Sequence, residues 1–200
     1  MVASGAVGYL IGSLPLGYLA ARRWAGVDLR HVGSGNVGAT NVIRVSGVAL
    51  GLAVMAMDVA KGFVSVAAAG VVAPTERDAV TAGVAAVAGH IFPIWLAGRG
   101  GKGVATAAGA FGCLAPEATA CAAAAFVVAA GATRFVSAGS VVATITLPLA
   151  ATAFGASPEV VTGGAVAAAL IVWRHRGNLR RIRRGTEPRL GRPGGAVSRA

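Results

Sequence analysis

Hydrophobic residues occur in long runs that short polar segments separate along the whole chain. Residues 1–21 contain no charged side chain, and the run from 47 to 73 is interrupted only by Asp58 and Lys61. Five further apolar stretches follow between single charges or charged loops, at 79–98, 103–116, 118–133, 135–158 and 160–173. A helix needs ~20 residues to cross a bilayer, and shorter spans can tilt or be shielded by neighbours. The pattern therefore predicts an all-α, polytopic membrane bundle of about seven transmembrane helices, without fixing the boundaries near 103–116.

The composition supports the same class. Hydrophobic residues make up 56% of the 200 positions, Gly contributes 30 more, and charged residues only 12%. A soluble domain carries about twice that charged fraction, and a disordered chain is more polar still. With only 2 Cys, a disulfide scaffold is excluded as well. We expect residues 1–200 to form a single integral membrane domain.

A net charge of +11 alone would suit a nucleic-acid partner as well as a membrane protein. The positions of the charges along the chain distinguish these two classes. With the N-terminus outside, every basic residue except Arg77 and Lys61 falls on the inner side. The inner segments are 22–46, 98–103, 133–137 and the basic tail 174–200, whereas Glu76, Asp78, Glu117 and Glu159 fall outside. Because Lys and Arg concentrate in cytoplasmic loops, this predicts a multi-pass protein of the bacterial inner or plasma membrane with a cytoplasmic C-terminus. No nucleic-acid partner is expected.

Three polar segments on that inner side carry candidate chemistry. The first is Gly33–Asn41, in which glycines alternate with small hydrogen-bonding residues, and it is followed by Arg44. Such a run can turn backbone N–H groups toward an anion, as can the start of the helix that follows. The alternative is a flexible linker that caps this helix, and spacing alone slightly favours the linker.

The second segment, Gly98–Thr106, is a glycine-rich loop with Arg99 and Lys102. It lacks the nucleotide-binding pattern Gly-x4-Gly-Lys-[Ser/Thr], because Leu96 stands at the first glycine and Gly103 at the last position. Hydrolysis of a nucleoside triphosphate is therefore not indicated. A phosphate cradle of another kind and a tight basic turn are equally compatible with the spacing.

The third segment runs from Arg174 to Glu187. If the last span continues as a helix, His175, Asn178 and Ile182 share one face, where a substrate could bind. The face of Arg176, Arg180 and Arg184 suits anionic lipid head groups. Inside the spans, Asp58 and Lys61 lie at i, i+3, so mutual neutralisation is the simplest interpretation.

These segments resemble the bacterial acyl-phosphate:glycerol-3-phosphate acyltransferases, a family of small integral membrane enzymes. The resemblance covers almost the whole chain and depends on its motifs occurring in order on a seven-span pattern. Those motifs are Gly12–Gly17, Gly33–Arg44, Asp58–Gly62, Gly89–Pro93, Gly100–Thr106, His175–Asn178 and Gly185–Glu187. Phe135 and Ala138 depart from the residues common in the family.

The resemblance implies transfer of a fatty acyl group from acyl phosphate to the 1-hydroxyl of glycerol 3-phosphate. The products would be 1-acyl-glycerol 3-phosphate (lysophosphatidate) and phosphate, in the first acylation step of phospholipid biosynthesis. It implies no cofactor and no metal, an active site at the cytoplasmic face, membrane lipid as a partner, and a soluble enzyme that supplies the acyl phosphate. Glu187 matches a structural acid of the family.

The same resemblance implies roles for individual residues. Residues that match catalytic positions are Ser34, Arg44, His175 and Asn178. Residues that match substrate-binding positions are Gly35, Asn36, Thr40, Asn41, Gly100, Gly101, Lys102, Gly103 and Ser140. The general base stays open between His175, whose pKa the nearby arginines should lower, and the phosphate of the substrate. The competing functions are a transporter for an organic phosphate and a structural partner of lipid-synthesis enzymes; neither chain-length preference nor oligomeric state follows from the sequence.

Overall fold

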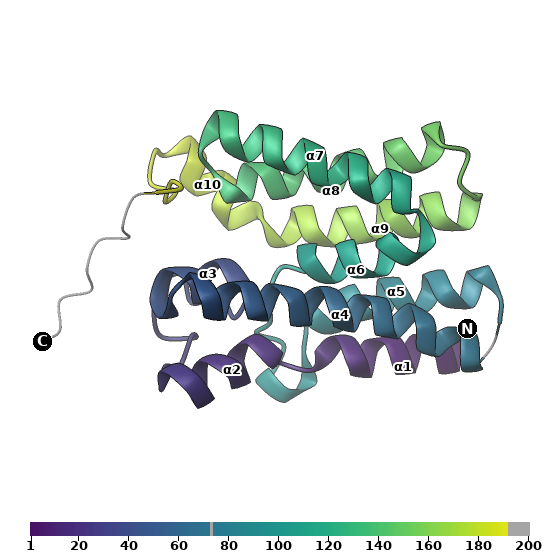
Figure 1. The fold of residues 1–200 in the computed structure, drawn as a ribbon, viewed down its shortest axis with the longest axis horizontal. Coiled ribbons are helices and arrows are strands. Elements are labelled where there is room, and N and C mark those ends of the chain that lie inside the picture. Colours follow the sequence, from purple (N-terminus) through teal and green to yellow (C-terminus); the bar gives the residue numbers. More distant parts are fainter. Residues whose placement is uncertain (73, 192–200) are drawn as a thin grey trace, which may run out of the picture.

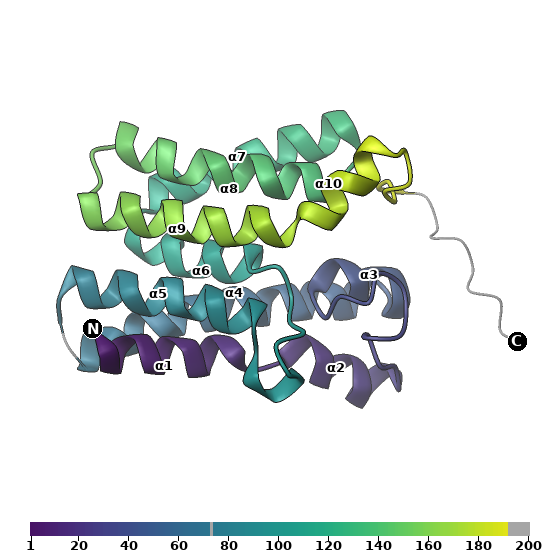
Figure 2. The same ribbon diagram turned by 180° about the vertical axis from the view of Figure 1, so that it is seen from behind.

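The computed structural model describes residues 1–72 and 74–191, and all regular elements in that part are helices. Most of them run along one long axis, with α7, α8 and α9 on one side, α1, α4 and α5 on the other, and α6 between (Figures 1 and 2). The helices are α1 (Val2–Ser13), α2 (Leu16–Ala25), α3 (Ala39–Ser46), α4 (Val48–Val72), α5 (Glu76–Ile91), the 3-10 helix η1 (Ile94–Leu96), α6 (Val104–Leu114), α7 (Pro116–Thr133), α8 (Val136–Ala153), α9 (Pro158–Arg174) and α10 (Arg176–Arg183).

Five helical segments are long and apolar enough to cross a membrane, and each overlaps most of one predicted run. They are Val2–Ala25, Val48–Val72, Glu76–Leu96, Pro116–Thr133 and Val136–Ala153. The two remaining runs are also helical, but α9 has 17 residues and α6 only 11. At 1.5 Å per residue, α6 is about 16 Å long, roughly half of a ~30 Å hydrocarbon core. The all-helical membrane bundle is confirmed, and the run near 103–116 is a half-length helix rather than a full span.

The first span is broken, which the uninterrupted apolar run 1–21 does not predict. α1 ends at Ser13, Leu14 has an extended backbone, and α2 begins at Leu16. Pro15 lies in the break, because proline has no N–H and its ring clashes with the preceding turn of a helix. The break ends one helix at Ser13 and starts a new one at Leu16.

Glycines set the closest helix contacts. A Cβ at Gly8 or Gly12 of α1 would overlap the carbonyl oxygens of Ala82 and Ala86 in α5, as expected for a small-xxx-small pair. A Cβ at Gly109 of α6 would likewise overlap the backbone of α4. The short α6 is therefore held directly against α4. Gly47, by contrast, ends α3 with a positive φ and does not belong to a helix interface.

The two ends of the bundle differ in charge. The N-terminus and the α4–α5 and α8–α9 turns lie at one end (Figure 1), where Arg77 and Glu159 form an ion pair of 3.2 Å. We call this the acidic end, because Glu76, Asp78, Glu117 and Glu159 belong to it. The opposite, basic end holds α2, α3 and α10 (Figure 2). The separation agrees with the expected charge asymmetry across the membrane, while the sidedness itself stays a prediction. Of the basic tail 174–200, residues 192–200 lie outside the described part.

Candidate active site

The three polar segments meet around one cavity of about 460 Å³. It is lined from the α2–α3 loop and α3, from the loop before α6, and from the junction of α9 and α10. The sequence-predicted residues that border it are Ser34, Asn36, Thr40, Asn41, Arg44, Lys102, Gly103, Ser140, His175 and Asn178. Gly35, Gly100 and Gly101 do not border it. Residues up to 144 positions apart in the chain thus form one site.

Asn41 shapes the first loop from within. Its side chain is buried, its Oδ1 accepts a hydrogen bond of 2.8 Å from the backbone N–H of Ser34, and its Nδ2 donates to the Val32 carbonyl at 3.1 Å. Asn36 closes a tight turn by accepting from the Gly38 N–H at 2.9 Å. With these polar groups engaged, Ser34, Thr40 and Arg44 are the side chains of this segment best able to meet a ligand.

The glycine-rich loop serves mainly to bring Lys102 to the cavity. The Gly100 N–H donates to the Ile91 carbonyl at 3.2 Å, and the Gly101 N–H donates to the His90 carbonyl at 3.0 Å. These two amides are therefore engaged within the protein, so of the two alternatives left open by the spacing, Gly100 and Gly101 fit the tight basic turn better than the phosphate cradle. Gly103, with a φ of 84°, instead starts α6 at the cavity wall.

Lys102 is a half-buried cation without an acidic partner among the described residues. Burial lowers the pKa of its ammonium group to about 8; Arg181, Arg44 and Arg174 lower this pKa further, and Glu187 partly opposes them. Below pH 8 the ammonium is still mainly charged. A buried cation without a counter-charge is unfavourable, so an anion bound in the cavity would supply the missing partner.

His175 is only 1% exposed and sits where α9 passes into α10. Its Nδ1 lies 2.8 Å from the carbonyl oxygen of Ile171. Because a carbonyl can only accept, Nδ1 carries the ring proton and Nε2 is left as an acceptor. Burial, and after it the charge of Lys102, lower the pKa of His175 to about 4. The expected decrease is present, but burial rather than the arginines is its main cause, and the imidazole is neutral at pH 7.

Glu187 organises the third segment by accepting three hydrogen bonds. The donors are Ser137 Oγ at 2.8 Å, Asn178 Nδ2 at 2.6 Å and Arg181 Nε at 2.8 Å. These donors stabilise the carboxylate against its burial, so the pKa of Glu187 is lowered. The carboxylate fixes Asn178 at the cavity wall. Ser137 also borders the cavity; its position three residues before Ser140, on the same helix face, was the only sequence signal for it.

The rest of the cavity is apolar and extends away from the basic end between helices. Its wall there comes from small and aliphatic residues of α6, α7, α8 and α9, among them Ala108, Ala122, Phe126, Leu147 and Ala168. In the described residues, no three His, Cys, Asp or Glu side chains gather in a way that could hold a metal ion. The site therefore combines a cationic, hydrogen-bonding mouth with an apolar interior, a shape suited to an amphipathic anion.

Comparison with known proteins shows the family to which the chain belongs. The family model "Glycerol-3-phosphate acyltransferase" matches residues 2–185. A glycerol-3-phosphate acyltransferase of Synechococcus sp. (strain CC9902) is 46% identical over 190 residues, covering 94% of each chain. One from Geobacter sulfurreducens is 42% identical over 185 residues, covering 92% of this chain and 95% of the relative.

Two solved structures share the fold. The crystal structure of PlsY, an integral membrane glycerol 3-phosphate acyltransferase, in its glycerol 3-phosphate form superposes with a TM-score of 0.89 at 37% identity, and 95% of each chain is covered. Its lysophosphatidic acid form gives a TM-score of 0.87 at 35% identity, with the same coverage. By family, sequence and fold, this chain belongs to the glycerol-3-phosphate acyltransferases, the integral membrane acyltransferases of phospholipid biosynthesis.

Proposed function

We propose that the protein transfers a fatty acyl group from acyl phosphate to the 1-hydroxyl of glycerol 3-phosphate, giving lysophosphatidate and phosphate. The observation that carries this proposal is the single cavity with a cationic mouth and an apolar interior. Glycerol 3-phosphate is a phosphate ester, and acyl phosphate is a mixed anhydride of phosphate and a fatty acid. Only acyl phosphate carries a long hydrocarbon chain. A cavity of this polarity can hold two phosphates at its mouth while the acyl chain lies between the helices.

Two cations are assigned to the phosphates. Arg44 and Lys102 approach the mouth from different segments, and no described acidic side chain pairs with either. The N-terminus of α6 at Gly103 adds backbone N–H groups and the positive end of a helix dipole. Ser34 and Asn178 are further hydrogen-bond donors at the wall. Holding both anions side by side supplies the proximity on which a direct transfer depends.

In the proposed step, the 1-hydroxyl oxygen attacks the acyl carbonyl carbon, and the bond from that carbon to the phosphate oxygen breaks. His175 accepts the hydroxyl hydrogen bond on Nε2 and so orients the nucleophile. With its pKa near 4, the imidazole is too weak a base to retain the proton at neutral pH. The proton therefore ends on a phosphate oxygen of the substrates. Cationic and amide donors at the mouth stabilise the oxyanion that forms on the carbonyl.

We place this reaction at the cytoplasmic face. Support comes from the concentration of Arg in α2, α3 and α10, at the same end of the bundle as the cavity mouth, since Arg and Lys mark cytoplasmic segments. Glycerol 3-phosphate would enter from the cytosol. A soluble enzyme that makes acyl phosphate would deliver the second substrate to the same face.

The test is a reconstitution with purified protein in detergent, where a transporter has no compartment to fill. We expect lysophosphatidate from acyl phosphate plus glycerol 3-phosphate, and none when acyl-CoA replaces acyl phosphate. Lys102→Ala should abolish most of the product. Arg99→Ala is the matched control, because Arg99 is an exposed cation of the same loop that does not border the cavity. Absence of product from well-folded protein, or equal losses in both variants, would refute the proposal.

A further inference from the structure

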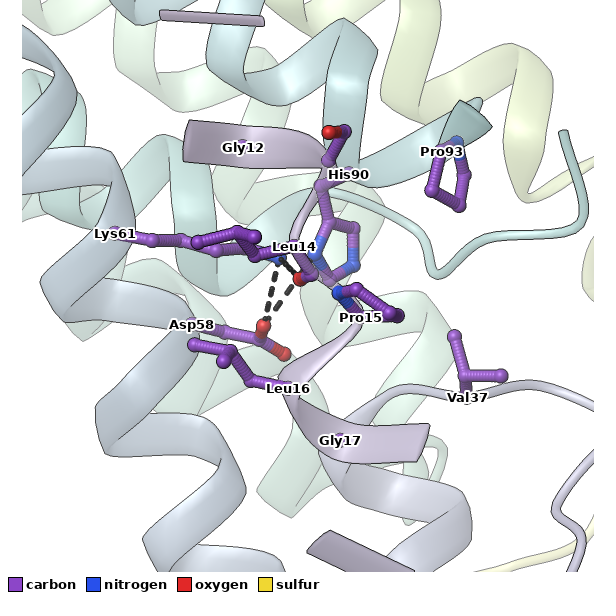
Figure 3. Close-up of a pocket in the computed structure, with 11 residues that line it drawn as sticks. Gly12, Leu14, Pro15, Leu16, Gly17, Val37, Asp58, Lys61, His90 and Pro93 are labelled. Atoms are coloured by element: carbon purple, nitrogen blue, oxygen red, sulfur yellow. Dashed lines mark hydrogen bonds and ion pairs between the residues drawn. The ribbon is translucent and has the colours of Figure 1, made fainter. Parts of the chain in front are cut away.

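A buried cluster of charged and polar groups lies beside the break in the first span. Figure 3 shows Asp58 and Lys61 of α4 and His90 of α5 converging on the segment from Leu14 to Leu16. Lys61 Nζ lies 3.0 Å from Asp58 Oδ1, and His90 Nδ1 lies 3.4 Å from the same oxygen. The expected pairing of Asp58 with Lys61 is thus confirmed, and His90 is a third member.

The ion pair complements the two helix ends that the break creates. Lys61 Nζ donates to the Leu14 carbonyl at 3.2 Å, next to the end of α1. Asp58 and Leu16, the first residue of α2, line the same small pocket (Figure 3). A cation is favourable at a helix C-terminus and an anion at a helix N-terminus. The pair therefore stabilises the broken helix from within the protein, where both side chains are buried.

His90 connects this cluster to the loop that carries Lys102. A Cβ at Gly101 would overlap His90 Nε2, and the Gly101 N–H donates to the His90 carbonyl at 3.0 Å. Gly100 also lies against the backbone of His90. The two glycines directly before Lys102 therefore contact both the side chain and the main chain of His90. A shift of the imidazole toward Gly101 has to move the loop, because there is no free space between them.

These contacts point to a role for the cluster that extends the proposed function. We propose that Asp58, Lys61 and His90 are positioning residues that fix Lys102 at the cavity mouth and so set the affinity for glycerol 3-phosphate. Asp58 and His90 also border the larger cavity, but their side chains are only 4% and 7% exposed. They act through the loop and not by touching the substrate. This inference rests on the proposed function, in which Lys102 binds a substrate phosphate.

The experiment measures KM for each substrate and kcat in purified variants. Asp58→Asn keeps the shape but removes the charge that pairs with Lys61 and that faces His90 Nδ1. We expect KM for glycerol 3-phosphate to rise roughly tenfold, within the range of couplings between contacting residues, while KM for acyl phosphate stays within about twofold. His90→Ala should act in the same direction, and His90→Gln, which keeps a polar side chain of similar reach, should restore part of the affinity.

Asp78→Asn is the matched control. Asp78 is another buried carboxylate between α1 and α5, hydrogen-bonded by Ser4 Oγ at 2.8 Å, but it lies at the acidic end, far from the loop. Removing it should lower the thermal unfolding midpoint without changing the ratio of the two KM values. Detergent size-exclusion and the unfolding midpoint report folding for every variant. Where Asp58→Asn is too unstable to purify, the two His90 variants decide.

The outcomes separate this inference from the one on which it rests. A wild-type protein without acyl phosphate-dependent activity refutes the proposed function. An active wild type whose folded Asp58→Asn and His90→Ala variants keep the normal KM for glycerol 3-phosphate refutes the positioning role alone. Equal increases in both KM values, or the same change in Asp78→Asn, would also overturn it, because they indicate a general loss of structure.

Discussion

Charges at the two ends of the bundle have opposite surroundings. At the acidic end, Asp78 accepts from Ser4 Oγ at 2.8 Å and pairs with the N-terminal amine of Met1, and Arg77 pairs with Glu159. At the basic end, Arg44 and Lys102 face a cavity without a described acidic partner, although Glu187 nearby is engaged by Arg181. Paired charges at one end close the helix turns, whereas unpaired charges at the other are available to a ligand.

The largest effect should follow from removing the unpaired cation. Lys102→Met keeps the apolar stem and deletes the charge, so kcat/KM for glycerol 3-phosphate should fall about 100-fold or more, as for truncation of a buried charged hydrogen-bond partner. The unfolding midpoint should stay equal or rise, because a buried cation without a partner is removed. Steady-state kinetics and thermal unfolding check both. A variant that loses stability together with activity would show that Lys102 is a structural residue, like the charges of the acidic end.

A smaller effect should follow at Glu187, a paired charge of the basic end. Glu187→Gln replaces an acceptor of three hydrogen bonds by an amide, which frees Asn178 at the cavity wall. We expect kcat/KM to fall roughly 10- to 100-fold, comparable to the loss of groups that orient ligating residues. The unfolding midpoint should fall as well. Unchanged kinetics in this variant would mean that Asn178 needs no fixed orientation.

The comparison also predicts a pH dependence. Lys102 has a pKa near 8, and only its protonated form attracts an anion. The affinity for glycerol 3-phosphate is therefore highest at pH values below that pKa. Above pH 8, KM for glycerol 3-phosphate should rise by up to about tenfold per pH unit. His175, with a pKa near 4, should add no titration between pH 5 and 8. A basic limb that persists in Lys102→Arg, whose guanidinium stays charged, would assign the effect to another group.

The smallest effect should come from the acidic end. Ser4→Ala removes one hydrogen bond to Asp78 in a fully buried contact, so the free energy of unfolding should fall by about 1 kcal/mol. Catalysis should not change, because the contact lies at the opposite end of the bundle from the cavity mouth. Thermal unfolding and kcat/KM are measured on the same sample. A loss of activity without a loss of stability would contradict the division between the two ends.

The sequence was most informative where a single element determines the outcome. Apolar runs located the helices, and the i, i+3 spacing of Asp58 and Lys61 predicted their pairing. The break at Pro15 escaped the hydropathy pattern, because Leu14 and Leu16 on both sides are as apolar as a continuous span. The short run 103–116 already indicated less than a full span, but only the fold shows that α6 ends at Leu114.

Features that depend on contacts between distant segments were less predictable. A glycine near Lys102 can expose its amide to a ligand or make room for a neighbouring side chain. The sequence alone does not distinguish these two roles for Gly100 and Gly101. Only the position of His90 against them decides in favour of packing. In the same way, Glu187 could be matched to a family acid from the sequence, but its three donors come from two helices that only the fold brings together.

The short length of α6 has a consequence for how the product leaves the site. Because this helix is only 11 residues long, the loop before it lies beside the α1–α2 break, set back from the end that holds α3 and α10 (Figure 2). Under the proposed function, the acyl chain already lies among lipid-facing helices when the new ester bond forms. The product therefore need not cross an aqueous phase. It can diffuse sideways into one leaflet, and the leaflet that faces the supply of glycerol 3-phosphate is the one that grows.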